Sequence, residues 1–270
     1  MKKVILLCLM MAFIAGACTK DKGDPPVLPP ATSMTIDFSN FTSLVKSAET
    51  RSVKGENNSA WEFAAVPVVF WKYVVNTILY IPVASFKVTI DQNPVYVAEK
   101  TWEWKYSTTI ENINYQTRLN GQITGNEVKW KMYITKQNGF TDFLWFEGTS
   151  ALDGKSGQWI LYQDNENPNV KILQIDWSAI DGSTIPHVTY TYVKEGFNSG
   201  NFIEYGPLSV TGSQYNSFYK IKYSHALTEK TYSIDVEWNS GTKKGRVKSP
   251  DYLLGEWYCW DSNRINVSCN

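Results

Sequence analysis

The feature that most constrains the fold is a run of short alternating segments from about residue 83 to residue 238. Each segment places an apolar or β-branched side chain at every second position, and each ends at a cluster of Gly, Asn, Asp or Pro residues. Alternation with a period of two is typical of strands with one buried face, and such clusters favour turns. The pattern therefore predicts a mainly β fold, an antiparallel meander of about ten strands.

The alternation also assigns side chains to faces. In the segment TWEWKYS, Trp102, Trp104 and Tyr106 share one face, whereas Glu103 and Lys105 share the other. A shift of one residue would move the aromatic rings into water, so the register is strongly set. A twisted sheet of this size tends to curl, and closure removes its free edges. We therefore expect a barrel or a half-barrel, similar to lipocalin-like barrels and to the open barrels of periplasmic lipoprotein carriers.

Residues 61–86 are apolar for most of their length and differ from the alternating segments. Asn58 or Ser59 is a suitable N-cap, so the pattern predicts a helix over about 60–81, with Pro82 marking its end. A helix that is apolar nearly all round is either buried or in a membrane. Its charged residues and prolines favour burial in or on the sheet. A β-strand is the alternative, because Val, Ile and Tyr are frequent in this segment.

A first short strand is predicted before this helix, where Met34, Ile36 and Phe38 alternate with polar residues. By length, the chain from residue 34 to residue 270 is expected to form a single β-rich domain.

The start of the chain has the layout of a secretory signal: two lysines, an apolar run and then small residues. The apolar run is shorter than the about 20 residues that a membrane-spanning helix needs. The sequence AGAC before and at Cys18 resembles the lipobox of bacterial lipoproteins, with Ala15 where Leu is commonest. The resemblance implies a signal peptide over 1–17 and a lipid-anchored Cys18. The alternative is a plain signal peptide with an incidental cysteine.

Residues 18–33 are polar, charged and rich in proline, which predicts a flexible tether. Lys20 and Asp21 look like the export signal of surface lipoproteins in the Bacteroidota. That resemblance implies an outer-membrane protein on the cell surface. Display toward the periplasm is the alternative.

Two cysteines remain once the signal peptide and the lipid attachment site are set aside. Cys259 and Cys269 lie close together near the C-terminus, and an exported protein permits a disulfide between them. A metal site there would need a nearby His or a third Cys, and neither is present.

Charge and motifs argue against several function classes. The formal net charge is +0 and the basic residues are scattered, so no basic face for nucleic acid is predicted. The segment GTSALDGKSG has five residues between its first two glycines where a phosphate loop has four, and a predicted strand follows. His187 and His225 lie far apart and lack partners at zinc spacing. No cofactor or metal is expected.

One pair of carboxylates, Glu147 and Glu204, is a candidate for glycoside hydrolysis. Glu147 follows Phe143 and Trp145 at alternate positions, and a carboxylate on an apolar face has a raised pKa, which suits an acid. Strand ends also place carboxylates at a barrel rim without any catalytic role.

The segment EWYCWDSN carries the aromatic residues Trp257, Tyr258 and Trp260. Alternation places Tyr258 and Trp260 on one side and Trp257 with Cys259 on the other. An exposed pair would stack on a sugar or on an apolar molecule. Packing around the disulfide is the alternative, and we favour it.

The sequence leads us to expect a non-enzymatic binding or structural module, held at the outer membrane through Cys18, with no predicted oligomeric state. One alternative is a lipocalin-like carrier of an apolar ligand. That alternative requires residues 61–81 to lie outside the barrel, because a helix inside would fill the cavity. A second alternative is an envelope glycoside hydrolase.

Overall fold

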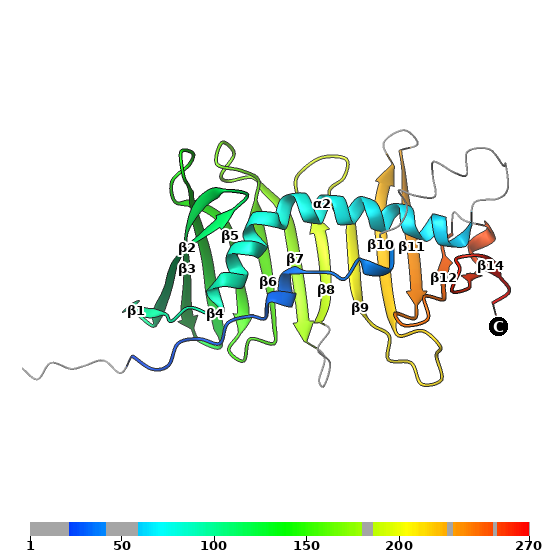
Figure 1. The fold of residues 1–270 in the computed structure, drawn as a ribbon, viewed down its shortest axis with the longest axis horizontal. Helices are drawn as coiled ribbons and strands as arrows, with labels where there is room; N and C mark the ends of the chain where they lie inside the picture. Colours follow the sequence, from blue (N-terminus) through cyan, green and yellow to red (C-terminus); the bar gives the residue numbers. More distant parts are fainter. Residues whose placement is uncertain (1–21, 42–58, 180–185, 226–228, 251–252, 270) are drawn as a thin grey trace, which may run out of the picture.

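The computed structural model describes residues 22–41, 59–179, 186–225, 229–250 and 253–269. Its strands form one 14-stranded antiparallel sheet in which neighbours in sequence are neighbours in space, from β1 to β14 (Figure 1). The strands are β1 Val95–Ala98, β2 Thr101–Ile110, β3 Ile113–Thr124, β4 Glu127–Lys136, β5 Phe143–Ala151, β6 Ser156–Tyr162, β7 Lys171–Ala179, β8 Pro186–Tyr192, β9 Phe202–Pro207, β10 Ser217–His225, β11 Lys230–Trp238, β12 Gly245–Lys248, β13 Tyr258–Trp260 and β14 Asn266–Val267. The helical elements are η1 Ala31–Met34, η2 Ser39–Phe41, α2 Ala60–Thr89 and η3 Leu253–Gly255.

The antiparallel meander is confirmed, but ten strands is too few. The short strands β12, β13 and β14 were not predicted, because a few residues show too little alternation. The turn between β1 and β2 was also missed. Its residues Glu99 and Lys100 both have positive φ angles, 48° and 56°, without the Gly or Asn that usually marks such a turn.

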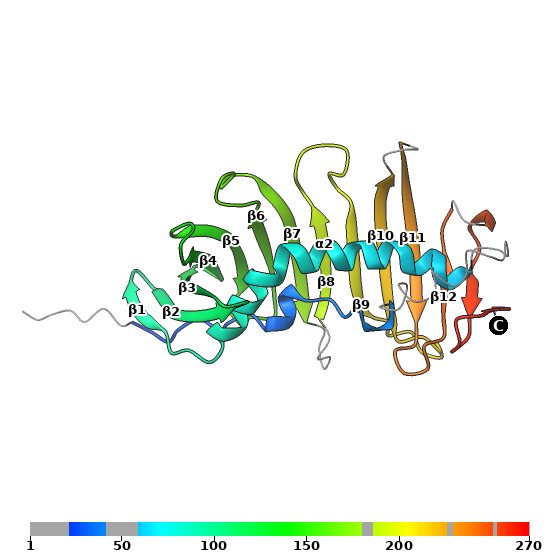
Figure 2. The same ribbon diagram turned by 45° about the horizontal axis from the view of Figure 1, so that its top comes forward.

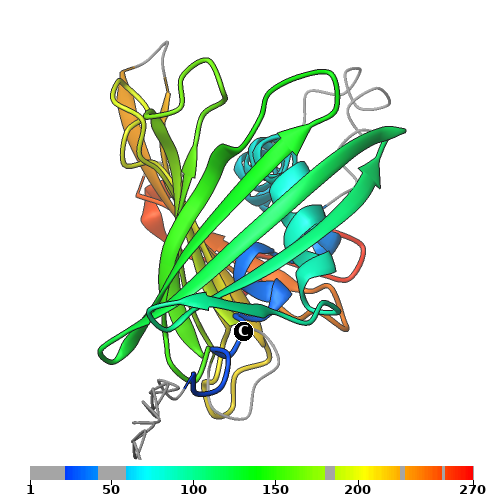
Figure 3. The same cartoon turned by 90° about the vertical axis from the view of Figure 1, so that its left-hand side faces the viewer.

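The sheet is open. Among the described strands, β1 and β14 are the two ends of the strand order, and they lie at opposite ends of the molecule (Figure 1). Viewed along its length, the sheet curves around α2, so it has a concave face toward the helix and a convex face away from it (Figure 3). A closed barrel is therefore not formed.

The predicted helix is present as α2, a 30-residue helix about 45 Å long. It begins as expected, with the Ser59 hydroxyl accepting a hydrogen bond from the Glu62 amide at 3.1 Å. It does not end at Pro82, which lies inside the helix and only removes one backbone donor. The C-terminal part of α2 runs in a different direction (Figure 1), and buried residues there, such as Phe86, offset the lost hydrogen bond by packing.

Both ends of α2 are tied to the ends of the sheet (Figure 2). At its N-terminus, the Ala60 amide donates to the Asn266 side chain on β14 at 2.9 Å. At its C-terminus, the Tyr106 hydroxyl of β2 donates to the Ser85 carbonyl and lies 2.7 Å from the Thr89 hydroxyl. The helix therefore crosses the strands and connects the two ends of the open sheet.

Tryptophans on the concave face lie against glycines of the neighbouring strand. A Cβ added to Gly121 would lie 2.5 Å from the ring of Trp130, its cross-strand partner, and one added to Gly245 would overlap the ring of Trp260. Gly148 and Gly157 make room in the same way for other tryptophans. Because these glycines have no side chain, each indole lies directly against the backbone of the neighbouring strand.

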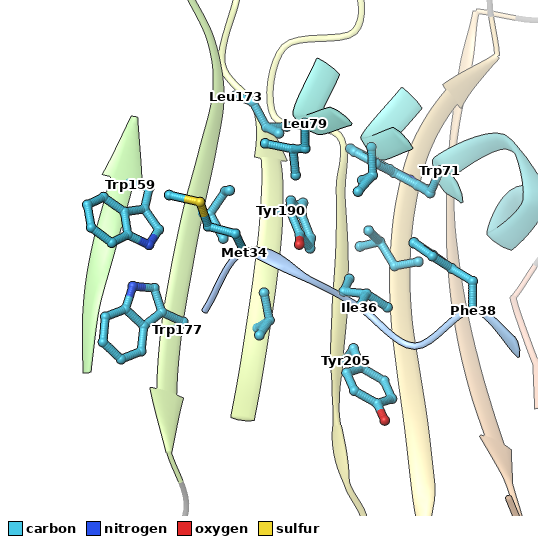
Figure 4. Close-up of a cluster of buried hydrophobic side chains, with 14 of the residues drawn as sticks. Met34, Ile36, Phe38, Trp71, Leu79, Trp159, Leu173, Trp177, Tyr190 and Tyr205 are labelled. Atoms are coloured by element: carbon cyan, nitrogen blue, oxygen red, sulfur yellow. The ribbon is translucent and has the colours of Figure 1, made fainter. Parts of the chain in front are cut away.

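The expected first strand is replaced by η1, an extended stretch and η2. Met34, Ile36 and Phe38 are buried as predicted, but this stretch is not part of the sheet. It lies across the concave face of the strands, beside α2 (Figures 1 and 4). There, the Trp159 indole donates to the Ser33 hydroxyl at 3.1 Å. Alternation thus reports an extended chain with one buried side, whether or not that chain pairs with a strand.

The N-terminal tether packs on the domain over part of its length. Pro26 and Pro29 are buried, and Val27 lies directly over Gly154 in the β5–β6 turn. The chain from Pro26 to residue 33 therefore belongs to the folded domain. The segment 1–17 that was predicted to be a signal peptide, together with Cys18, Lys20 and Asp21, lies outside the described residues.

Candidate functional site

A groove opens on the concave side between α2 and residues 34–38. Its volume is about 470 Å³, within the range of roughly 300 to 1,000 Å³ that is typical of small-molecule sites. The residues that line it are Met34, Thr35, Ile36, Phe38, Val75, Asn76, Leu79, Tyr80, Val83, Ala84 and Lys87.

Two segments build the walls of this groove. On α2, Val75, Leu79 and Val83 follow one another at intervals of four residues, so they form a single row along the helix. On the opposite wall, Met34, the last residue of η1, and the extended residues Thr35, Ile36 and Phe38 line the groove. The groove therefore requires both segments, because each of them supplies one wall.

The rim of the groove carries its polar groups. Lys87, in the last turn of α2, is exposed, and Tyr80 is 52 % exposed. The ionisable side chains of the lining residues are therefore one amine and one phenol. Such a lining is suited to binding an apolar chain and offers no carboxylate, imidazole or thiol for acid–base chemistry.

A stripe of exposed apolar and aromatic residues adjoins the groove. Val66, Phe70, Tyr73 and Tyr80 are spaced along the outer side of α2, and each is more than half exposed. By length and hydropathy, α2 is a candidate membrane span, although its opposite side packs on the sheet. Exposed apolar surface of this kind marks interaction sites.

The three C-terminal aromatic residues do not form one surface. Trp260 is 2 % exposed, and its indole donates to the Lys243 carbonyl at 2.9 Å, so it is part of the core. Tyr258 is half-buried and packs against that core. Only Trp257 stands on the convex side, where the Arg246 guanidinium lies 4.2 Å from its ring centre. Cys259 and Cys269 form the expected disulfide.

Glu147 does not lie where alternation placed it. A β-bulge at Trp145 inserts one residue into β5, so counting from Phe143 no longer gives the face of Glu147. Glu147 pairs with the exposed Lys131 on the convex face. It accepts a hydrogen bond from the Tyr162 hydroxyl at 2.6 Å. Burial, together with this carboxylate, raises the pKa of Tyr162 to about 12.

Glu204 pairs with His187 rather than with Glu147. The His187 Nε2 atom lies 2.8 Å from a Glu204 oxygen, and this hydrogen bond lowers the pKa of Glu204. A lowered pKa is the opposite of what a catalytic acid needs. Glu204 is on β9 and Glu147 on β5, four strand positions apart, or about 19 Å. Carboxylate pairs in glycoside hydrolases are within about 10 Å, so the structure does not bring this pair together.

Within the described part of the chain, no group of three His, Cys, Asp or Glu side chains is arranged to hold a metal ion. The side chain of His225 lies outside the described residues. Sequence reasoning missed the groove itself, because its two walls are some 40 residues apart in the chain. The only signal was the shared apolar character of both segments. No family model, curated protein or solved structure matches the chain.

Proposed function

We propose that this chain is a lipid-anchored lipoprotein of the outer membrane, displayed on the cell surface, which acts as a non-enzymatic binding module. Its binding site is the groove between α2 and residues 34–38. The observation that supports this function is an apolar lining that is open at the surface and has a single cation, Lys87, at its rim.

The ligand that fits this lining is a single acyl chain with an anionic head group. Each methylene that enters the groove is removed from water, which is worth about 0.8 kcal/mol. The exposed Lys87 ammonium at the rim favours a negative head group, with an attraction of about 1 kcal/mol or less because water screens it. A bulky multi-chain lipid exceeds the volume of about 470 Å³.

The groove differs from the cavity of a lipocalin-like carrier. The concave face is occupied by α2 and by buried tryptophans such as Trp71 and Trp159, so an enclosed cavity inside the sheet is not the binding site. The ligand lies instead at the surface of the molecule, between helix and extended segment. Rapid exchange with a membrane or a partner protein suits such a site.

The lipid anchor is tested by Cys18→Ala in the full chain. We expect this variant to leave the membrane fraction, because the acylated residue is absent. A Cys18→Ala variant that fractionates with membranes like the natural chain would contradict the anchor, whatever the groove binds.

The groove is tested on the chain that begins at Thr19, which contains every residue of the described fold. Native mass spectrometry should detect a co-purified amphiphile, and a fluorescent fatty acid should bind and be displaced by unlabelled fatty acid. Ala84→Trp fills the groove and should weaken binding at least tenfold. Thr77→Trp, on the exposed side of the same helix, is the matched control and should bind normally.

A second variant tests the head group. Lys87→Glu should weaken binding of the fatty acid but not of the corresponding fatty alcohol. Equal affinities of the Ala84→Trp and Thr77→Trp variants, or no binding at all, would refute the groove as the site.

A further inference from the structure

A second pocket lies on the convex face, between the β9–β10 loop and the strands β11 and β12. Its volume is about 590 Å³, and it is lined by loop residues 208 and 210–215 together with Glu237 and Arg246. These two charged residues pair directly across the strands. The Glu237 Oε2 atom accepts from the Arg246 Nε at 2.8 Å and lies 2.6 Å from Nη2.

Two aromatic rings hold the guanidinium of Arg246 in place. The Trp257 ring centre is 4.2 Å from the guanidinium carbon, and the Tyr215 ring centre is 5.0 Å from it. Both distances are within the range of cation–π attraction. Because Arg246 is fixed by Glu237 and by two rings, its remaining donors have set directions.

The loop that covers the pocket is firmly attached to the sheet. The Asn216 amide donates to the Trp238 carbonyl at 3.0 Å, and the Asn239 side chain donates to the Gln214 carbonyl at 2.8 Å. The Ser240 amide donates to the Asn216 side chain at 2.9 Å. A pocket with such a loop exists before any ligand arrives, so binding loses little conformational entropy.

The charges of the pocket favour a neutral ligand. Glu237 already neutralises Arg246, so an anion would compete with a carboxylate that is in place. The pair uses Nε, Nη2 and Oε2, which leaves Nη1 as a donor and Oε1 as an acceptor. Neighbouring hydroxyl groups of a sugar both donate and accept hydrogen bonds, and they match this combination.

The apolar parts of the pocket are suited to the C–H groups of a sugar ring. Leu208, Val210 and the ring of Tyr215 are among the lining residues. The C–H groups of a pyranose pack favourably on aliphatic and aromatic surfaces. We infer that this pocket is a binding site for a neutral sugar, separate from the apolar groove on the concave face.

The inference is tested with a glycan array and with titration calorimetry on the chain that begins at Thr19. We expect binding of one or more neutral glycans. Thr211→Trp blocks the mouth of the pocket from an exposed loop position and should weaken binding at least tenfold. Thr109→Trp, at an exposed position on β2, is the matched control and should bind like the unmodified chain.

A second variant keeps the test independent of the loop. Arg246→Lys retains the charge but not the planar fork, and it should also weaken sugar binding at least tenfold while Ala84→Trp leaves it unchanged. The inference is refuted if no neutral glycan binds, if only acidic glycans bind, or if Thr211→Trp and Thr109→Trp bind alike.

Discussion

The concave and convex faces of the sheet are built from alternate residues of the same strands, but they are stabilised differently. The concave face carries buried tryptophans that pack against glycines and against α2. The convex face carries polar side chains that pair across strands, such as Lys220, which lies between Glu204 and Asp235. The concave face is therefore stabilised by close packing of side chains. The convex face is stabilised by charge pairs and hydrogen bonds near the solvent.

The difference also separates the two candidate sites. The concave groove is mainly apolar and is formed by segments that cover the sheet. The convex pocket has both polar and apolar lining residues and is formed by a loop and a charged pair on the sheet itself. Substitutions on the concave face should therefore change stability most. Substitutions on the convex face should change binding with less effect on stability.

The largest contrast is expected at two neighbouring residues of β6. Trp159→Ala empties a fully buried site under α2 and should lower the free energy of unfolding by about 3 to 5 kcal/mol. Gln158→Ala, one residue earlier on the convex face, removes a hydrogen bond to Asp176 and should cost about 1 kcal/mol or less. Urea unfolding of both variants measures the difference, and similar losses would contradict the contrast between the faces.

Alanine substitutions at glycines on the two faces test the same difference in stability. In Gly148→Ala on the concave face, the added methyl would overlap the Gln158 carbonyl and lie 2.5 Å from the Trp159 ring, so we expect a loss of about 2 to 3 kcal/mol. In Gly206→Ala on the convex face, the methyl would lie 2.6 Å from the ring of His187 and 3.0 Å from that of Phe218, and both neighbours are side chains rather than backbone. Thermal unfolding should show a clearly smaller shift for Gly206→Ala, and the reverse order would contradict this account.

Alkaline pH tests the connection between the concave face and the helix. Burial raises the pKa of Tyr106 to about 12, from an ordinary value of 10.0. The protonated phenol is the form that the fold favours, so its contribution is complete below pH 10 and is lost as the pH rises toward 12. Tyr106→Phe should cost about 1 to 2 kcal/mol at pH 7, because the hydrogen bond to Ser85 is lost.

Above pH 10, the stability of Tyr106→Phe should fall less steeply than that of the unmodified chain. Tyr73→Phe, which changes a ring that is 71 % exposed on the outer side of α2, should leave the curve unchanged. Chemical unfolding between pH 7 and pH 12 provides the measurement. Parallel curves for the Tyr106→Phe variant and the unmodified chain would show that this tyrosine does not couple helix and sheet.

The smallest effect is expected for the hydrogen bond between His187 and Glu204 on the convex face. His187 lowers the pKa of Glu204 below its ordinary value of 4.5, so the carboxylate contributes stability above that value and loses it as the pH falls through the lowered pKa. Because the pair is partly exposed, Glu204→Gln should cost less than about 1 kcal/mol at pH 7. The difference from the unmodified chain should vanish in acid, and a constant difference down to pH 3 would contradict the pairing.

Local patterns predicted much of the fold. The alternation in β2 correctly assigned Trp102 and Trp104 to the buried face, because a strand with one wet side has a period of two. The cap at Ser59 correctly marked the start of α2. The disulfide between Cys259 and Cys269 was correctly expected from their proximity in the chain.

The predictions from the sequence were wrong where one local pattern is compatible with more than one structure. Pro82 ends a helix only if no packing offsets its lost hydrogen bond, and here Phe86 and other residues beyond it are buried on the sheet. The extra residue at Trp145 reversed the expected face of Glu147, since a bulge has no reliable sequence mark. Ile36 and Phe38 lie on an extended stretch as predicted, but this stretch packs on the concave face beside α2 and is not a strand of the sheet.

The sequence by itself determined the antiparallel meander, the faces of its strands and one long apolar helix, because these depend on periodicity and on neighbours along the chain. Only the tertiary structure decided that the sheet stays open with α2 across its concave face. It alone also brought residues 34–38 to Leu79, and Tyr215 and Trp257 to Arg246. These contacts join segments far apart in the chain, so they depend on sheet curvature and on the packing of indoles against glycines, which no local pattern encodes.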